Sequence, residues 1–426
     1  MSNSIDTLFK CPYTLERLHK CGYLSSYLDP FAEWLEKQQF PHSTKRKHIS
    51  NVAHLSHSLK GIETDIGDIN QHIQRFYEHM SRCKCKGWRK PKNTIHITHS
   101  FSRFKLYLSE RYGISFKSEN LAYEEIYNEY LCWLNEKFKL ENSTIELRAS
   151  YLKQFLHWYK KASGYKSIQT LTPNDIESFF ITATSRWGRA YKRSLQATLR
   201  SFFDFCFEHK YTLQNLRFSL PVIKSYRLSE VPKKIDEGEA AKLIQSIDQS
   251  TPGGKRTYAI LQLINNYGIR GCQVNALRLK DIDWHKEEIY FPAVKYGKSN
   301  SFPLLTDVGN ALLDYLTVRK KSTFPEVFLT LHAPYRPLKD SGMGNILSQT
   351  IREAMLKAKI NSSSKGVYCF RHGFVSRMLK QGESFKSIAD LLGHKHIQTT
   401  FIYTKIDFNS LAEVALELPE VEYENY

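Results

Sequence analysis

Apolar residues recur at helical spacing through most of residues 1–225. The pattern is clear in the segments FAEWLEKQQF, IQRFYEHM, YLKQFLHWYK and LRSFFDFCFEHK, where apolar side chains return every three or four positions. Few segments in this half alternate between apolar and polar residues, as a half-buried strand would. The first half is therefore predicted to be all-α.

The helical half contains an internal duplication at an offset near 99 residues. Trp34-Leu35 matches Trp133-Leu134, Ser43-Thr44 matches Ser143-Thr144, and SRFKLYLSERY matches RSFFDFCFEHKY. The two copies share the entry to a third helix, DIGDINQHIQRF in one and TPNDIESFF in the other, where Asp or Asn can cap the first N–H groups. Four matches in the same order favour true repetition. Each copy is predicted to be a four-helix unit.

The pattern changes at VIKSYRLSEVPKKIDEGE, which has the composition of an interdomain linker. A helix is expected at DEGEAAKLIQSI, followed by one long apolar helix over TYAILQLINNYGIRGCQVNALRL. EEIYFPAV and SNSFPLL then alternate as two strands would around the turn KYGK, and from Phe328 the spacing is helical again. The second half is predicted to be mainly α with a small antiparallel sheet.

Charge suggests a class of partner. The 426 residues include 61 Lys and Arg against 43 Asp and Glu, a net charge of +18. Such a surface attracts a polyanion, with nucleic acid the first candidate and an anionic membrane surface the second, although many basic proteins bind neither. No stretch approaches the roughly 18 to 20 apolar residues of a membrane span, and the N-terminus lacks the apolar core of a signal peptide. We therefore expect a cytoplasmic protein without membrane partners.

The eight cysteines give no sign of a metal site by their spacing. The close pair is Cys83 and Cys85 in CKCKGW, and no CxxC pair is present to indicate a zinc ribbon. Reduced and mostly buried thiols are expected. No Walker-type phosphate loop and no cluster of carboxylates occurs either, so neither a cofactor nor a metal is predicted.

Four motifs between residues 267 and 404 carry the chemistry: YGIR, VKYGKSNSFPL, YCFRHGF and LLGHKHIQTTFIYT. Together they resemble the catalytic domain of the tyrosine recombinases, the phage-integrase and Xer-like enzymes, over roughly residues 230–410. The resemblance assigns the family's two arginines to Arg270 and Arg371, its hairpin lysine to Lys295, its Leu-Gly-His histidine to His394 and its nucleophile to Tyr403. The gaps of 23 residues from 371 to 394 and of 9 residues from 394 to 403 are typical of the family.

The reaction explains why these residue types must meet. A tyrosine hydroxyl that attacks a phosphodiester stays attached to it, so the bond energy is kept for rejoining. Two guanidiniums can bind the non-bridging oxygens of the transition state in bidentate fashion. The resemblance implies that Lys295, preferred to Lys298, protonates the leaving 5′ oxygen, and that His394 donates to a phosphate oxygen.

Two positions depart from the family pattern. Tyr368 stands where a histidine is usual, three residues before the second arginine, and a phenol donates well but is a poor base at neutral pH. Gln273 replaces an acidic residue, which removes a carboxylate from that region. His372 is assigned a structural role, and Cys272 and Cys369 are expected to be buried, inert thiols.

The resemblance also implies a domain order: residues 118–226 as a core-binding DNA domain and 227–407 as a mixed α+β catalytic domain. Residues 1–117 are expected to repeat the core-binding unit, with basic runs at KRKHISNVAHLSHSLK and CKCKGWRKPKNTIH that would contact phosphates or, alternatively, protein. Residues 408–426 would form a tail helix that docks on a neighbouring subunit or folds back. The implied partners are double-stranded DNA, further copies in a tetramer on two sites, and possible accessory proteins at the nucleoid. Two alternatives stay open: a DNA-binding protein that has lost cleavage, and a topoisomerase of the same chemistry.

Overall fold

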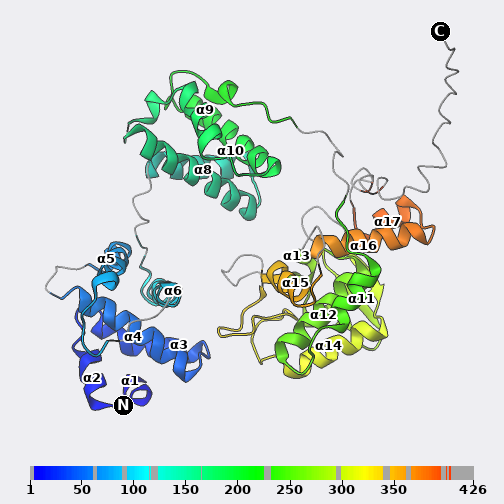
Figure 1. The fold of residues 1–426 in the computed structure, drawn as a ribbon, viewed down its shortest axis with the longest axis horizontal. Helices are drawn as coiled ribbons and strands as arrows, with labels where there is room; N and C mark the ends of the chain where they lie inside the picture. Colours follow the sequence, from blue (N-terminus) through cyan, green and yellow to red (C-terminus); the bar gives the residue numbers. More distant parts are fainter. Residues whose placement is uncertain are drawn as a thin grey trace, which may run out of the picture. The chain divides into compact units, whose positions relative to one another are not determined.

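The computed structural model describes most of the chain: residues 4–60, 65–88, 94–114, 116, 123–164, 166–224, 232–293, 299–338, 346–360, 366–394, 400 and 403. Contacts divide the chain into two compact units, residues 1–31 with 46–227 and residues 32–45 with 228–426. The fold is mainly α with one small antiparallel sheet, as predicted (Figure 1). The predicted tail over 408–426 and residues 225–231 of the predicted linker lie outside the described residues.

The N-terminal helices follow one another in short steps. They are α1 (Ser4–Leu8), α2 (Pro12–His19), α3 (Ser25–Lys37), α4 (His42–Ser58), the 3-10 turn η1 (Ile66–Asp68), α5 (Ile69–Arg82) and α6 (Thr94–Tyr112). Their core is rich in aromatic side chains, and the Phe31 ring packs against those of Phe104 and Tyr107 at centroid distances of 5.1 and 5.2 Å. Offset and edge-to-face contacts of this kind stabilise a helical core beyond the area that they bury.

A second helical set follows. It comprises α7 (Glu124–Phe138), α8 (Asn142–Ser163), η2 (Ile168–Thr170), α9 (Pro173–Thr182), α10 (Arg189–Glu208) and η3 (Leu216–Ser219). Tyr130, Phe155 and Phe202 are fully buried in its core. None of the helices in the described part of the chain is both long and apolar enough to cross a membrane.

The order of elements agrees with the predicted duplication. In both sets two helices precede a 3-10 turn, and two more follow it: α3 to α6 in the first and α7 to α10 in the second. The capping prediction holds only for the 3-10 turn in the first set: the Asp65 carboxylate accepts the N–H of Gly67 and caps η1, but Asp68, the residue before α5, forms no side-chain cap. In the second set it is wrong in detail, because Thr172 is the cap. Its hydroxyl accepts the N–H of Asp175, whose carboxylate accepts the N–H of Thr172 in return.

The remaining described elements belong to the second unit. They are α11 (Glu237–Gln245), α12 (Pro252–Tyr267), α13 (Gly271–Ala276), η4 (Leu279–Asp281), β1 (Ile282–Asp283), β2 (Glu288–Phe291), β3 (Asn300–Pro303), α14 (Thr306–Val318), α15 (Ile346–Lys357), α16 (Val367–Lys380) and α17 (Phe385–Leu391). Apolar α12 is buried along most of its length, in a core shared with α14, α15 and α16. The helices that carry the motif residues pack on this core.

The long apolar helix predicted over residues 257–279 is wrong, because the chain breaks it in two. Gly268 ends α12 with φ +58° in the left-handed region, and α13 begins only at Gly271. A Cβ at Gly268 would also lie 2.5 Å from a ring carbon of Phe374. Both the backbone angle and the close approach require glycine here, so the break is built into the sequence.

The predicted hairpin is present. Strand β2 pairs antiparallel with β3, with Ile289 opposite Phe302 and Phe291 opposite Asn300, and the short β1 extends the sheet on the other side of β2. Ile289 and Phe291 point into the core while Glu288 and Tyr290 face outward. This alternation is the period-two pattern from which the strands were predicted.

Candidate active site

The two arginines of the motifs converge on one backbone oxygen. Arg270 lies at the N-terminal end of α13, and its Nη1 donates to the carbonyl of Leu392 at 3.2 Å. Arg371 lies on α16, and its Nη2 donates to the same carbonyl at 3.0 Å. Leu392 directly follows α17, so three segments far apart in sequence meet at this point. The two positive charges are held side by side, as binding to a single phosphate requires.

A second carbonyl fixes the orientation of Arg371. Its Nη1 donates at 2.8 Å to the oxygen of Gly268, the residue that ends α12. The Arg371 side chain is buried, and its guanidinium therefore bridges the end of α12 and the end of α17. The YGIR and Leu-Gly-His motifs thus place backbone oxygens as well as side chains.

His394 contacts Arg371 directly. Its Nε2 lies 3.0 Å from Arg371 Nη2, and its Nδ1 lies 2.7 Å from the hydroxyl of Thr400. A guanidinium only donates hydrogen bonds, so Nε2 must accept in this contact, which leaves the proton on Nδ1 to be donated to Thr400. In this arrangement His394 orients Arg371. Its predicted donation to a phosphate oxygen stays a prediction.

Tyr403 is buried beside these arginines and is bonded to His372. Its hydroxyl lies 3.1 Å from His372 Nδ1, and the two rings meet edge to face at 5.3 Å. The tyrosine packs with Phe374, Val375 and Leu392. His372 was expected to be structural, and the structure adds that its partner is the predicted nucleophile. The position of His372 next to Arg371 marks it as a residue near the site, but the sequence does not indicate that Tyr403 is its partner.

The pKa shifts of His372 and Tyr403 fit a hydrogen bond in which the tyrosine hydroxyl donates to the imidazole. Burial lowers the pKa of the His372 imidazole, with a further contribution from Arg371, so the ring is neutral at pH 7 and its Nδ1 can accept a proton. Burial raises the pKa of the Tyr403 hydroxyl, while the charges of Arg371 and Arg270 oppose that rise. Tyr403 therefore carries its proton at neutral pH and donates it toward His372.

At pH 7 the guanidinium of Arg371 is charged and the imidazole of His394 is neutral. Burial first, and then Arg270, lowers the pKa of Arg371 to about 10, which still leaves the guanidinium charged at pH 7. Burial and the same two arginines lower the pKa of His394 to about 4, so its ring is neutral. The site presents two cations and two neutral imidazoles to an incoming anion.

The two residues that depart from the family pattern, Tyr368 and Gln273, differ in burial and in hydrogen bonding. The Tyr368 side chain is 64% exposed on the first turn of α16, one helical turn before His372, so its hydroxyl is open to solvent. Gln273 is buried, and its side-chain oxygen accepts the backbone N–H of Arg270 at 3.1 Å. A neutral amide thus does the capping that a carboxylate would do at this position.

Lys295 and the alternative Lys298 lie outside the described residues. The ends of their hairpin are nevertheless tied to the site. Asn300 Nδ2 donates to the carbonyl of Leu391 at 2.7 Å, and the Tyr267 hydroxyl donates to the carbonyl of Pro303 at 2.8 Å. Strand β3 is therefore fixed to the segments that carry His394 and Arg270.

The two cysteines next to the motifs differ from each other. Cys369 is buried, as expected, and burial raises the pKa of its thiol. Cys272 is only partly buried, so the expectation of a buried thiol is wrong there. It lies in the first turn of the short helix α13, which packs one face on the core and leaves the other outside.

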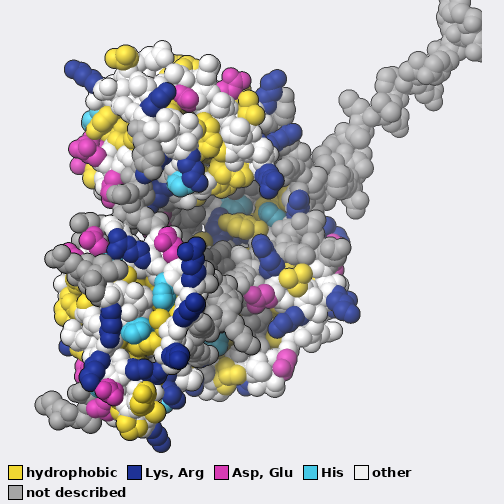
Figure 2. All heavy atoms as spheres, turned by 60° about the vertical axis from the view of Figure 1, so that its left-hand side comes forward, with side chains coloured by type: hydrophobic (Ala, Val, Ile, Leu, Met, Phe, Trp, Pro, Cys, Tyr) yellow, Lys and Arg dark blue, Asp and Glu magenta, His cyan; other side chains and the backbone are white. Residues whose placement is uncertain are grey.

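The second helical set has a basic outer face. On α10 the side chains of Arg189, Arg193 and Arg200 are exposed, whereas Leu195 and Leu199 are buried. Figure 2 shows Lys and Arg side chains spread over the visible surface. Basic residues along an exposed helix face suit the phosphates of a nucleic acid.

In the first set, the predicted phosphate contacts are partly wrong. Lys45 is buried and paired with Glu36, and His48 is buried with its Nδ1 2.9 Å from the hydroxyl of Ser100. His54 is also buried. These side chains face inward because α4 packs one side against the aromatic core, a fact that the basic composition of the segment concealed.

Comparison with known proteins agrees with this geometry. Residues 233–410 match the model of the phage integrase family. The putative integrase/recombinase y4rA of Sinorhizobium fredii is 30% identical over 404 residues, 93% of this chain and 95% of that protein. The tyrosine recombinase XerC of Oceanobacillus iheyensis is 26% identical over 68% of this chain and 95% of its own. The crystal structure of the XerH site-specific recombinase bound to difH shares the fold, with a TM-score of 0.50 and 16% identity over 82% of this chain and 98% of that one. The chain therefore belongs to the phage integrase family, the tyrosine recombinases.

Proposed function

We propose that this tyrosine recombinase cuts and rejoins DNA at specific sites through a covalent bond between Tyr403 and a 3′ phosphate. One observation carries the proposal: a buried tyrosine hydroxyl is bonded to a neutral imidazole beside two arginines that share one carbonyl. Relatives named integrase/recombinase and XerC support the substrate class.

In the first step the Tyr403 oxygen attacks phosphorus while His372 Nδ1 takes its proton. The bond from phosphorus to the 5′ oxygen breaks, and the phosphotyrosine bond forms. The 5′ oxygen leaves with a proton that we assign to Lys295, with Lys298 as the alternative. Ligation reverses the step with another 5′ hydroxyl, so one phosphoester replaces another and no nucleotide is hydrolysed.

Arg270 and Arg371 stabilise the charge that gathers on the non-bridging oxygens. Within the described part of the chain, Arg270 is partly exposed and donates to Leu392 O, and we propose that its remaining N–H groups bind phosphate. Arg371 is more occupied, since Gly268 and Leu392 orient it. We propose that Arg371 holds its positive charge in a fixed position beside the phosphate. Arg270 then makes the larger number of hydrogen bonds to the phosphate oxygens. We propose that His394 supports Arg371 and donates to phosphate once its tautomer changes; its contact with Arg371 supports the first role. We also propose that Tyr368, which is exposed at the start of α16, donates to the DNA backbone.

The arrangement on DNA is also a proposal. Residues 118–226 bind the core site through faces such as that of α10, residues 1–117 extend the footprint, and residues 227–407 carry the reaction. Four copies join two sites and exchange strands through a Holliday junction, with residues 408–426 docking in trans and accessory proteins setting the direction. The protein acts in the cytoplasm at the nucleoid.

The experiment uses duplexes taken from the DNA that flanks the gene. Each carries a nick just beyond the scissile phosphate, so that cleavage releases a short piece and traps the covalent complex. The wild-type chain should give a protein–DNA adduct that resists denaturation, whereas Tyr403→Phe should bind the duplex without forming one. An adduct with Tyr403→Phe would show that the nucleophile is misassigned. Relaxation of any supercoiled plasmid without site preference would favour a topoisomerase instead.

A further inference from the structure

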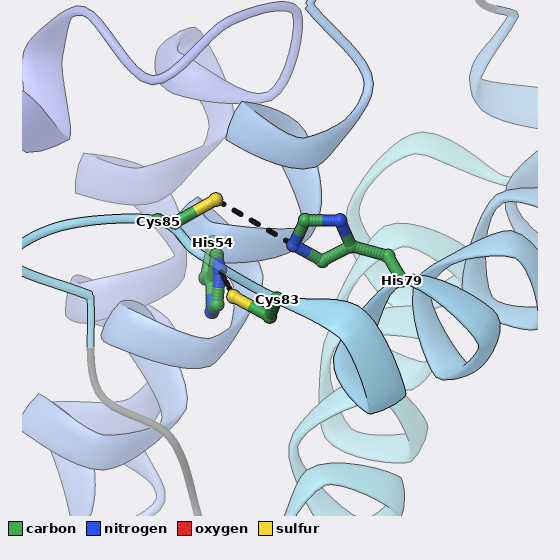
Figure 3. Close-up of side chains that lie close together, drawn as sticks. All are labelled: His54, His79, Cys83 and Cys85. Carbon is green, nitrogen blue, oxygen red and sulfur yellow. Dashed lines mark hydrogen bonds between the residues drawn. The ribbon is translucent and has the colours of Figure 1, made fainter.

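Four side chains of metal-binding types meet in the N-terminal helical set, in a part of the sequence that carries none of the catalytic motifs. They are His54 on α4, His79 in the last turn of α5, and Cys83 and Cys85 in the segment that follows α5 (Figure 3). Each offers one ligand atom, and the four atoms all lie within 4.8 Å of one another. The cluster joins two helices and a loop at one point.

The distances fit one bound ion. Cys83 Sγ lies 3.6 Å from His54 Nε2, and Cys85 Sγ lies 3.5 Å from His79 Nε2. A tetrahedral zinc site, with Zn–S about 2.3 Å and Zn–N about 2.0–2.1 Å, places sulfur and nitrogen ligands about 3.6 Å apart. The two contacts therefore have the length of two edges of such a tetrahedron.

The surroundings of the cluster resemble those of a structural site. His54 and Cys83 are buried, and the Trp88 ring stacks on the His54 ring at 5.4 Å with an interplanar angle of 10°. Phe76 meets His54 edge to face. This apolar cover limits access of water to the ligands, and the protein supplies all four of them, which leaves no open position for a substrate.

The residue types select the metal. Two sulfurs and two imidazole nitrogens in a tetrahedral arrangement favour zinc over magnesium or calcium, which prefer oxygen ligands. Two thiolates would balance the charge of the ion. Lys84 and Lys86 are exposed on the same loop.

We propose that His54, His79, Cys83 and Cys85 bind one structural Zn²⁺ ion. The ion fixes the loop of residues 83–88 to α4 and α5, and with it the direction in which Lys84 and Lys86 project. The sequence pattern, H-x3-C-x-C with a distant histidine, lacks the CxxC pair by which zinc sites are usually found, so the spacing alone did not indicate it. This site is independent of the strand-transfer chemistry.

The test measures metal in the full-length chain, purified without a polyhistidine tag from zinc-supplemented medium. Elemental analysis should give one zinc per chain. Replacement by Co²⁺ should give the visible bands of tetrahedral cobalt and a thiolate-to-cobalt charge-transfer band. Removal of zinc by a chelator should lower the melting temperature of the N-terminal helices by about 5–10 °C, and added zinc should restore it.

Variants locate the site. Cys85→Ala and His79→Ala change partly exposed ligands, so their loss of zinc and of the cobalt bands does not depend on core packing. Cys83→Ser should lose both as well, while Cys21→Ser, which alters a buried cysteine of the same helical set outside the cluster, should keep them. Wild-type protein without zinc and without cobalt bands would overturn the proposal and leave two thiol–imidazole hydrogen bonds. Unchanged zinc in Cys85→Ala and His79→Ala would place the metal elsewhere.

Discussion

Replacement of His372 tests whether the contact with Tyr403 is catalytic. In His372→Ala the Tyr403 hydroxyl loses its contact with the His372 imidazole, and we expect attack to wait for spontaneous loss of the proton. A tyrosine with a pKa of about 10 or above is ionised at pH 7 in a fraction of about 10⁻³ or less. Burial raises the pKa of Tyr403, while the two arginines limit that rise. We therefore expect the cleavage rate at pH 7 to fall by about 10³ or more, within the range of a lost general base.

The pH dependence separates a base from a positioning residue. Wild-type cleavage should change little between pH 7 and 9 and fall only in acid, below the ordinary histidine pKa of about 6.5, because burial lowers the pKa of His372. In His372→Ala the rate should rise about tenfold per pH unit, as the phenolate fraction does. The deficit at pH 7 should therefore shrink about a hundredfold by pH 9.

The assay is single-turnover formation of the covalent adduct on a nicked duplex at saturating protein, which removes any effect on DNA binding. His372→Asn is the matched control, since its amide can still contact the Tyr403 hydroxyl but cannot take the proton. It should show the same rising pH profile as His372→Ala. A rate reduced by the same factor at every pH would assign His372 to positioning, and a wild-type rate would remove it from the mechanism.

Four further predictions follow from the same structure. Arg270→Ala and Arg371→Ala should each lower single-turnover cleavage by about 10² to 10³, and a defect in binding alone would contradict their role. Lys295→Ala should be rescued by a duplex whose 5′ leaving oxygen is replaced by sulfur, because a thiolate leaves without a proton. Tyr368→Phe should slow cleavage while Tyr368→His keeps or raises it; a wild-type rate in Tyr368→Phe would make the residue structural. His48, whose pKa burial lowers to about 4, should cost the fold up to about 3 kcal/mol as pH falls from 6.5 to 4, since only the unfolded chain protonates in that window. Urea unfolding of His48→Gln should show a shallower loss over that range.

The candidate catalytic residues were predicted from the resemblance to the tyrosine recombinases, and their roles in the reaction stay predictions. Arg270, Arg371, His394 and Tyr403 were found by order and spacing, and the structure brings all four together. The shared carbonyl of Leu392 could not be predicted, because a backbone oxygen has no signature in sequence. The same is true of the partner of His372, since adjacency on a helix does not say which ring nitrogen faces which group.

The basic composition of α4 led to the prediction of more exposed basic residues than the helix presents. The run KRKHISNVAHLSHSLK is rich in Lys, Arg and His, yet a helix shows only one face to solvent. His48 and His54 lie on the inner face with Ile49 and Val52. Histidine carries little charge at pH 7, so it can be buried in a way that an unpaired lysine cannot. Counting it among phosphate ligands overstated the basic surface.

Gly268 determines both where α12 ends and how the two arginines of the site are positioned. As an apolar window, residues 257–279 read as a single helix, since a glycine inside a helix costs only about 1 kcal/mol relative to alanine. The observed break turns the chain so that Arg270 begins a new helix and the carbonyl of Gly268 is free to accept from Arg371. A continuous helix would have placed Arg270 half a turn past Gly268 and committed that carbonyl to the helix. The glycine that weakens the helical pattern is thus the residue at which the chain turns so that both arginines donate to the same carbonyl, that of Leu392.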